Sequence, residues 1–261
     1  MPELPDVEIF KKYVDSTSLH KKVNQVEVKD SSVLKVASQT LKNNLEARTF
    51  EKAERRGKHL FVSTNDQKWL ALHFGMTGSL YYSETKNDFP AHTLVLFHFD
   101  SGGHLAYGCQ RKLGAIDIAE SPDQFCEEHD IGEDALEVGR DTFRQLLGKE
   151  QRMIKSVLMD QSVIAGLGNI YSDEVLYQSK IHPKTKTSNL SDEQIKDLYQ
   201  NMQRILKTSV NNQADPEKLP THYLITHREE GAECPECGSP IKRIKISGRG
   251  SYFCPNCQKK G

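Results

Sequence analysis

The chain has 261 residues, of which 36% are hydrophobic and 27% charged, and its 35 basic and 36 acidic residues leave a formal net charge of −1. This composition is typical of a folded globular protein and excludes the disordered and membrane-embedded classes. No apolar run approaches the roughly 20 residues that span a bilayer, and no apolar signal segment stands at the N-terminus. We therefore expect a cytoplasmic protein.

The first predicted element is a short amphipathic helix over residues 5–16, where Val7, Phe10 and Val14 recur at helical spacing. From about residue 23 to 118 the pattern changes to short apolar segments, separated by turns that contain glycine. These segments read VNQVEV, KHLFVS, WLALHF, SLYYS, HTLVLFHF, HLAY and GAIDI. They predict strands of a β-meander or a β-sandwich.

Beyond residue 120 the apolar spacing becomes helical, within residues 142–160, 169–179 and 191–210. Ser191 is a good N-cap for the last of these helices, because acidic and amide residues follow it. We expect an α+β protein in three parts. They are a β-rich part (residues 1–125), a helical part (126–224) and a cysteine-rich tail (225–261).

The cysteine-rich tail holds four of the six cysteines, as two CxxC pairs with 16 residues between them. This spacing is typical of a tetrahedral zinc site with four thiolate ligands, and two disulfides or four free thiols are the alternatives. Because about 37 residues cannot build a core of their own, one structural zinc ion would fold the tail. Its ligands would be Cys234, Cys237, Cys254 and Cys257.

Between the two cysteine pairs runs the basic segment IKRIKISGRGSYF, which contains no acidic residue. Lys242, Arg243, Lys245 and Arg249 would lie on a hairpin, with glycines on both sides of Arg249. Such a hairpin suits contact with a phosphate backbone. The alternative is a solvated basic hairpin with no partner.

A turn with two glycines, IAGLGN, separates two predicted helices and places Asn169 at the start of the second. Free amide groups at that helix N-terminus would bind a phosphate. Turns of this kind also occur without any ligand. The basic hairpin in the same chain favours the interpretation that this turn binds a phosphate.

Together these features resemble the formamidopyrimidine-DNA glycosylase/endonuclease VIII family of base-excision repair enzymes. The matching segments follow the family's order along nearly the whole chain. They are PELPDVE at the start, RRGKHL (55–60), LHFGMTGSL (72–80), QRKLG (110–114), IKSVLMDQ (154–161), GLGNIYSDE (166–174), IHP (181–183) and GRGSYFCPNCQ near the end.

The resemblance implies an N-terminal helix with a two-layered β-sandwich, then a helical helix–two-turn–helix domain that ends in a four-cysteine zinc-finger β-hairpin. Damaged double-stranded DNA would lie between these parts. The protein would act as a monomer, associated with the nucleoid when it is bound to DNA.

Pro2 and Glu3, taken alone, are ordinary residues for the start of a helix. The resemblance implies that Met1 is removed and that the secondary amine of Pro2 attacks C1′ of the damaged nucleoside. The resulting iminium ion has no N–H proton to lose, so it serves as an electron sink for elimination at C2′. An N-terminal amine titrates near pH 8 in model peptides, and Glu3 would act as the general acid and base.

Other residues, which alone would be surface or loop side chains, also acquire roles from the resemblance. Lys58 would contact a phosphate and assist β-elimination, and Arg249 would clamp a phosphate during δ-elimination. Once the damaged base has left the stack, other side chains would fill the gap and contact the DNA. They are Met76, His92, Arg111, Leu113 and Asn169.

Two departures from the family pattern concern the choice of lesion. Leu113 stands where purine-type members usually carry phenylalanine. Only 23 residues (211–233) separate the last long predicted helix from Cys234, and purine-type members commonly have a longer segment there, which forms a loop that closes over everted 8-oxoguanine. Formamidopyrimidines, oxidised pyrimidines as in endonuclease VIII, and bulkier lesions are therefore alternative substrates.

Two other classes of function are alternatives to the enzyme. A non-catalytic zinc-hairpin protein could use the same scaffold to bind DNA, but binding alone requires neither Pro2 nor Glu3. A zinc-ribbon protein of transcription or translation would match only the last 30 residues.

Overall fold

Eight β-strands form two four-stranded antiparallel sheets, in agreement with the predicted two-layered sandwich. The computed structural model describes residues 1–85 and 88–259. The first sheet has the order β1-β6-β7-β5 and the second the order β2-β3-β4-β8. The strands are β1 (Val23–Val28), β2 (Phe50–Arg56), β3 (His59–Thr64), β4 (Trp69–His73), β5 (Gly78–Ser83), β6 (Thr93–Phe99), β7 (His104–Cys109) and β8 (Ala115–Ala119).

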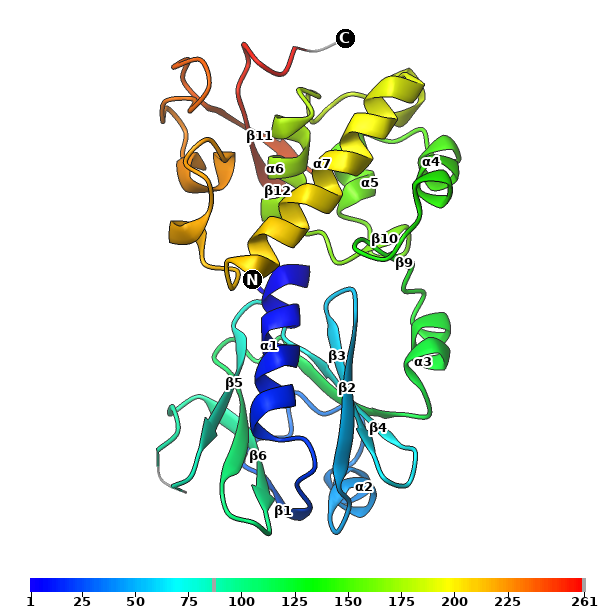
Figure 1. Cartoon of the computed structure of the whole chain (residues 1–261), viewed down its shortest axis with the longest axis vertical. Helices are drawn as coiled ribbons and strands as arrows, with labels where there is room; N and C mark the ends of the chain where they lie inside the picture. Colours follow the sequence, from blue (N-terminus) through cyan, green and yellow to red (C-terminus); the bar gives the residue numbers. More distant parts are fainter. Residues whose placement is uncertain (86–87, 260–261) are drawn as a thin grey trace. The chain divides into compact units, whose positions relative to one another are not determined.

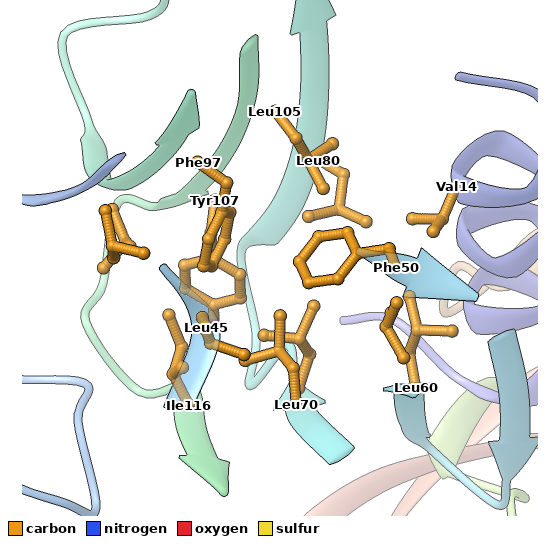
Figure 2. Close-up of a cluster of buried hydrophobic side chains, with 14 of the residues drawn as sticks. Val14, Leu45, Phe50, Leu60, Leu70, Leu80, Phe97, Leu105, Tyr107 and Ile116 are labelled. Carbon is orange, nitrogen blue, oxygen red and sulfur yellow. The ribbon is translucent and has the colours of Figure 1, made fainter. Parts of the chain in front are cut away.

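The hydrophobic core lies between the two sheets, as Figure 2 shows. Leu60 and Leu70 of the second sheet and Phe97 and Leu105 of the first sheet are fully buried or nearly so. Side chains alternate between the two faces of a strand, so every second residue of each strand reaches this core.

Helix α1 (Leu4–Thr17) packs against strands of both sheets (Figure 1, blue). The rings of Phe10 and Phe74 lie 4.5 Å apart, and the Tyr13 hydroxyl accepts a hydrogen bond of 2.7 Å from the Tyr82 N–H. These contacts place the start of the chain on the sandwich, and the helix matches the one predicted for residues 5–16.

Two elements of this unit, α2 (Ser38–Leu45) and β2, were not predicted from the sequence. α2 buries only Leu41 and Leu45. β2 reads FEKAERR, with five charged residues in seven, because it is an edge strand with one face exposed. A short helix α3 (Pro122–Glu128) follows the last strand.

The remaining residues form a helical unit that ends in a β-hairpin, as predicted. α6 packs against α7, whose N-cap Ser191 forms a capping box with Gln194. The β-hairpin packs against α6 as well. The elements are β9 (Glu133–Asp134), α4 (Arg140–Gly148), α5 (Ile154–Leu158), β10 (Ile164–Ala165), α6 (Asn169–Gln178), η1 (Thr187–Asn189), α7 (Asp192–Asn211), η2 (Pro216–Lys218), η3 (Leu224–His227), β11 (Lys242–Ile246) and β12 (Arg249–Phe253).

The helical spacing within residues 142–160 corresponds to two helices, α4 and α5, rather than to one. Residues 149–153 between them pair with a distant segment. The Ile154 N–H donates to the Thr185 carbonyl, and Met153 forms a β-bridge with Lys186. These long-range hydrogen bonds replace the ones that would continue α4.

The chain divides into two units, Met1–His129 and Asp130–Gly261. The fold class is the predicted α+β class. Within the described part of the chain, no helix is both long and apolar enough to cross a membrane.

Candidate functional site

At the start of the chain, the acidic residue Glu3 is buried next to Pro2. Glu3 is the N-cap of α1, and its N–H donates to Asp6 Oδ2 at 2.8 Å within a capping box. Glu3 is only 1% exposed, whereas Pro2 is partly exposed. Burial also raises the pKa of Asp6. The start of α1 therefore holds a buried carboxyl group next to the partly exposed Pro2.

Lys58 lies in the tight turn between β2 and β3, where Gly57 has a left-handed backbone with φ of 54°. The turn is held by Arg55, which is buried. Its Nε donates to Glu8 of α1 at 2.8 Å, and its Nη1 donates to the Gly57 carbonyl at 3.2 Å. The helix that begins beside Pro2 thus also holds the turn that carries Lys58, which is itself buried.

Met76 and Leu113 lie on two loops that contact each other, the β4–β5 loop and the β7–β8 loop. The Thr77 hydroxyl accepts a hydrogen bond of 2.9 Å from the Arg111 N–H. A methyl group on Gly75 would lie 2.4 Å from the Leu113 carbonyl oxygen, so only glycine allows this approach. Among the described residues, the exposed large hydrophobic side chains are Met76, Leu113 and Met1. Each of these two contacting loops therefore presents one large apolar side chain to solvent.

His92 precedes β6 and packs beside β5. Its Nε2 lies 3.3 Å from the Tyr81 hydroxyl, which in turn accepts a hydrogen bond of 2.9 Å from the Ser79 hydroxyl. Both rings lie close to Gly108, where a Cβ atom would lie 3.0 Å from His92 Cδ2 and would require the imidazole to shift. This packing holds the imidazole in one position on the surface of the first sheet.

In the second unit, Asn169 is the first residue of α6 and bonds to two other elements. Its Nδ2 donates to the Gly250 carbonyl of the hairpin at 3.0 Å, and its Oδ1 accepts from Lys155 Nζ at 2.8 Å. Lys155 also donates to Asp173 at 2.5 Å, and both of these side chains are fully buried. One network therefore joins α5, α6 and the hairpin.

Asp173 is the acceptor that holds β12 against α6. It accepts hydrogen bonds from the Ser251 hydroxyl (2.8 Å) and from the Tyr252 N–H (3.1 Å). Arg228 donates at 2.8 Å to Asp173 Oδ2, the oxygen that also accepts from the Tyr252 N–H, and packs over the Tyr252 ring. These donors fix the carboxylate between α5, α6 and the hairpin.

Arg249 lies just after the tight turn of the hairpin, and its side chain is exposed. Its Nη1 contacts Met159 Sδ at 3.9 Å, and the neighbouring Ser247 hydroxyl lies 2.9 Å from the Ser156 hydroxyl of α5. The hairpin tip and α5 line an open cavity of about 630 Å³, which also includes Lys186. This hollow presents cationic groups to solvent.

The four cysteines of the tail come together as a cluster, as the spacing predicts. All four sulfur atoms lie within 4.8 Å of one another, and none is in a disulfide. The Cys237–Cys254 and Cys234–Cys257 sulfur pairs are 3.5 and 3.9 Å apart. Tetrahedral Zn–S bonds of about 2.3 Å require roughly 3.8 Å. The donor set therefore fits a zinc ion with no open position.

Groups around the cluster support metal binding. Hydrogen bonds from Ser239 and Asn256 lower the pKa of Cys237 to about 5, so this thiol ionises readily. The Tyr177 hydroxyl lies 3.2 Å from Cys234 Sγ. Gln258 accepts from the Cys254 N–H and donates to the Ile181 carbonyl, which ties the cluster to the helical unit.

Sequence reasoning did not single out Lys155, Asp173, Arg228 or Thr77 as site residues. The four-residue spacing of Asn169 and Asp173 places both on one face of α6, and this was the only local signal for the network. Arg228 and Thr77 join the site through contacts with residues far away in the sequence.

The fold and these sites define a protein that joins a β-sandwich unit to a helical unit with a four-cysteine hairpin. Three family models match it in this order. They describe a formamidopyrimidine-DNA glycosylase N-terminal domain (residues 1–116), a formamidopyrimidine-DNA glycosylase H2TH domain (131–219), and a zinc finger found in FPG and IleRS (231–260).

Similar proteins share this organisation over their whole length. A formamidopyrimidine-DNA glycosylase of Mycoplasma genitalium is 35% identical, over 99% of this chain and 96% of the relative. One from Streptococcus pneumoniae is 31% identical over the full length of both. The Lactococcus lactis Fpg in complex with abasic-site DNA is 29% identical and superposes with a TM-score of 0.89, over 99% of this chain and all of that one. The chain belongs to the formamidopyrimidine-DNA glycosylase family.

Proposed function

We propose that this protein is a bifunctional base-excision-repair enzyme, a DNA glycosylase with AP-lyase activity, that acts as a monomer on damaged double-stranded DNA. The observation that carries the proposal is that Glu3, the residue directly after Pro2, is buried. Family membership supports it. A DNA-binding module without catalysis would need neither residue.

In the proposed reaction, removal of Met1 exposes the secondary amine of Pro2. The amine nitrogen bonds to C1′ while the bond from C1′ to the damaged base breaks, and the departing base takes up the proton that the amine loses. Glu3 then protonates O4′ as the C1′–O4′ bond breaks, which opens the sugar ring and leaves an iminium ion. The iminium ion then withdraws electrons from C2′. Loss of the C2′ proton expels the 3′ phosphate, and a second elimination expels the 5′ phosphate.

Other residues serve this reaction by holding the DNA. Lys58 is held by the Arg55 turn and contacts a phosphate near the reacting sugar, and Arg249 neutralises the phosphate that leaves in the second elimination. Met76 and Leu113 fill the gap left by the everted base, with Arg111 beside them. His92 and Asn169 contact the backbone.

The zinc ion has a structural role in this proposal. Cys234, Cys237, Cys254 and Cys257 would hold it, and with four thiolate ligands it would supply no reactive water. Its contribution is to fold the hairpin that carries Arg249.

Reductive trapping on an abasic-site duplex tests the mechanism. With borohydride we expect a covalent protein–DNA complex through Pro2. Pro2→Gly, which replaces the secondary amine with a primary one, should form it more slowly, and Glu3→Gln should reduce base excision by at least about 100-fold. Absence of the covalent complex, or full activity in both variants, would refute the mechanism.

A matched pair of lysine variants tests the role of Lys58. Lys58→Ala should slow strand cleavage. Lys52→Ala, which removes an exposed lysine from the same β2–β3 hairpin, should not. Equal effects would show that general loss of positive charge, rather than the place of Lys58, is responsible.

For the lesion, we propose ring-opened formamidopyrimidines and oxidised pyrimidines ahead of 8-oxoguanine. The segment of residues 211–233 is short, and contacts with α6 hold part of it in place. The Ile225 N–H donates to Glu174 at 2.8 Å, and Arg228 pairs with Asp173. A segment held in this way is poorly suited to close over an everted purine. Excision rates on a panel of duplexes with these lesions test this order, and a preference for 8-oxoguanine would contradict it.

A further inference from the structure

We propose that the outer face of the second sheet carries a binding site for a small, flat, uncharged heteroaromatic molecule of one or two rings. The site is a cavity of about 270 Å³ beneath α3. Its volume lies just below the range of about 300–1,000 Å³ that is typical of drug-sized ligands, so it suits a smaller molecule. None of its lining residues belongs to the proposed catalytic or DNA-contacting set.

The floor of the cavity is formed by small residues between larger ones. His59 pairs with His73 and His73 with Ala115, so these three form one row across β3, β4 and β8. In the next row Ala71 pairs with Asp117. These residues face away from the sandwich core, because their neighbours along each strand face into it. Because Ala71 and Ala115 have small side chains, they leave space above the sheet beside the two imidazole rings.

The walls of the cavity are aromatic rings. The ring centroids of His59 and His73 are 4.8 Å apart, and Phe125 of α3 lies 5.6 Å from His59. His129 stacks on Phe125 at 3.9 Å, and its Nδ1 lies 2.9 Å from the Phe125 carbonyl oxygen, so the wall is rigid. Flat apolar surfaces with fixed orientation favour a flat aromatic ligand over a branched aliphatic one.

The polar groups of the cavity favour a ligand without net charge. Burial lowers the pKa of His59 to about 3 and also lowers the pKa of His73, so both imidazoles are neutral at pH 7. Within the described part of the chain, His59 Nδ1 is buried and has no hydrogen-bond partner. Lys35 and Asp117 carry opposite charges at the lining. A ring with both donor and acceptor edges could bond to Lys35 and Asp117.

The cavity adjoins the loops that carry the proposed DNA contacts. His59 follows Lys58 directly, and Ala115 comes two residues after Leu113. The Gly75 N–H lies 3.3 Å from His73 Nδ1. A molecule bound against His73 would therefore change the surroundings of the Gly75 amide, next to Met76.

Titration of the full-length protein with adenine, followed by NMR without DNA, tests the site. We expect saturable shifts of the His59 and His73 ring signals and of the Gly75 amide, with a dissociation constant of about 1 mM or tighter. Cyclohexanol, which has no aromatic ring, should give no saturable shift. Absence of saturable shifts with adenine, or equal binding of cyclohexanol, would overturn the proposal.

Two variants locate the binding. Ala71→Leu fills the floor and should weaken adenine binding at least about tenfold. Phe125→Leu, which keeps an apolar residue in α3, should weaken it about threefold or more. Unchanged affinity in the folded variants would place adenine elsewhere and overturn the proposal. Because binding is measured without DNA, failure here is distinguishable from failure of the glycosylase mechanism.

Discussion

Lys155 Nζ and Asp173 Oδ1 lie 2.5 Å apart, and neither side chain is exposed to solvent. The pair joins α5 to α6, and through Ser251 and Tyr252 the same carboxylate holds the hairpin that carries Arg249. Without Lys155, the only charged partner of Asp173 among the described residues would be Arg228, whose side chain is partly exposed and less well placed to compensate a buried charge. The position of the hairpin therefore depends on this pair.

Lys155→Met should destabilise the helical unit by about 1.5–3 kcal/mol, because Asp173 loses its fully buried charged partner and keeps Arg228, whose side chain is partly exposed. Hydrogen exchange of the α6 amides measures this. Arg144→Met, which breaks the exposed Arg144–Asp192 pair, should cost less than about 1 kcal/mol. Equal costs in the two variants would contradict the importance of the buried pair.

Thr77→Val should loosen the contact between the loops of Met76 and Leu113, because the Arg111 N–H loses its acceptor. A hydrogen bond of this kind is worth about 1 kcal/mol, so we expect excision to slow about fivefold. Single-turnover excision measures the effect. Thr40→Val on the exposed face of α2 is the control and should leave the rate unchanged.

Stability of the helical unit should fall as the pH rises from about 4.5 to 7, because burial raises the pKa of Glu174 from 4.5 to about 7. The folded protein binds the Glu174 proton more tightly than the unfolded chain does. The contribution of Glu174 to the free energy of unfolding is therefore fully present below pH 4.5 and is lost as the pH rises through 7. The expected loss is about 3 kcal/mol.

Glu174→Gln should remove this pH dependence, since the amide stays neutral and can still accept from the Ile225 N–H. Hydrogen exchange of α6 amides at pH 5 and pH 8 compares the variant with the wild type. Glu193→Gln, an exposed residue of α7, is the control. If the wild type and Glu174→Gln depend on pH equally, the group does not titrate in this range.

Loss of zinc should impair DNA binding more than it impairs the β-sandwich. We expect Cys237→Ser, or treatment with a chelator, to weaken DNA affinity at least about tenfold, because the hairpin needs the metal to fold. The single tryptophan, Trp69, lies in β4 and reports unfolding of the sandwich, which should not change. Cys126→Ser, outside the cluster, should leave affinity intact. Full affinity without zinc would disprove the prediction.

Several features could be predicted from the sequence because a few neighbouring residues encode them. The strand pattern of residues 23–118, the CxxC pairs and the Ser191 cap all follow from periods and spacings that the backbone imposes locally. β2 and α2 escaped prediction because an edge strand and a short helix bury too few residues to show a period. The interrupted helix at residues 149–153 also escaped, since a distant segment supplies its hydrogen bonds.

By itself, the sequence determined the α+β class, the cysteine cluster and the resemblance to a DNA-repair family. Only the tertiary structure decided that Glu3 is buried, that Lys155 and Asp173 form a buried ion pair, and that His59 and His73 line a cavity. These properties depend on exclusion of water and on contacts between residues far apart in the chain, as with Asp173 and Ser251, 78 positions apart. No local pattern records burial of this kind, because it arises only when separate elements pack together.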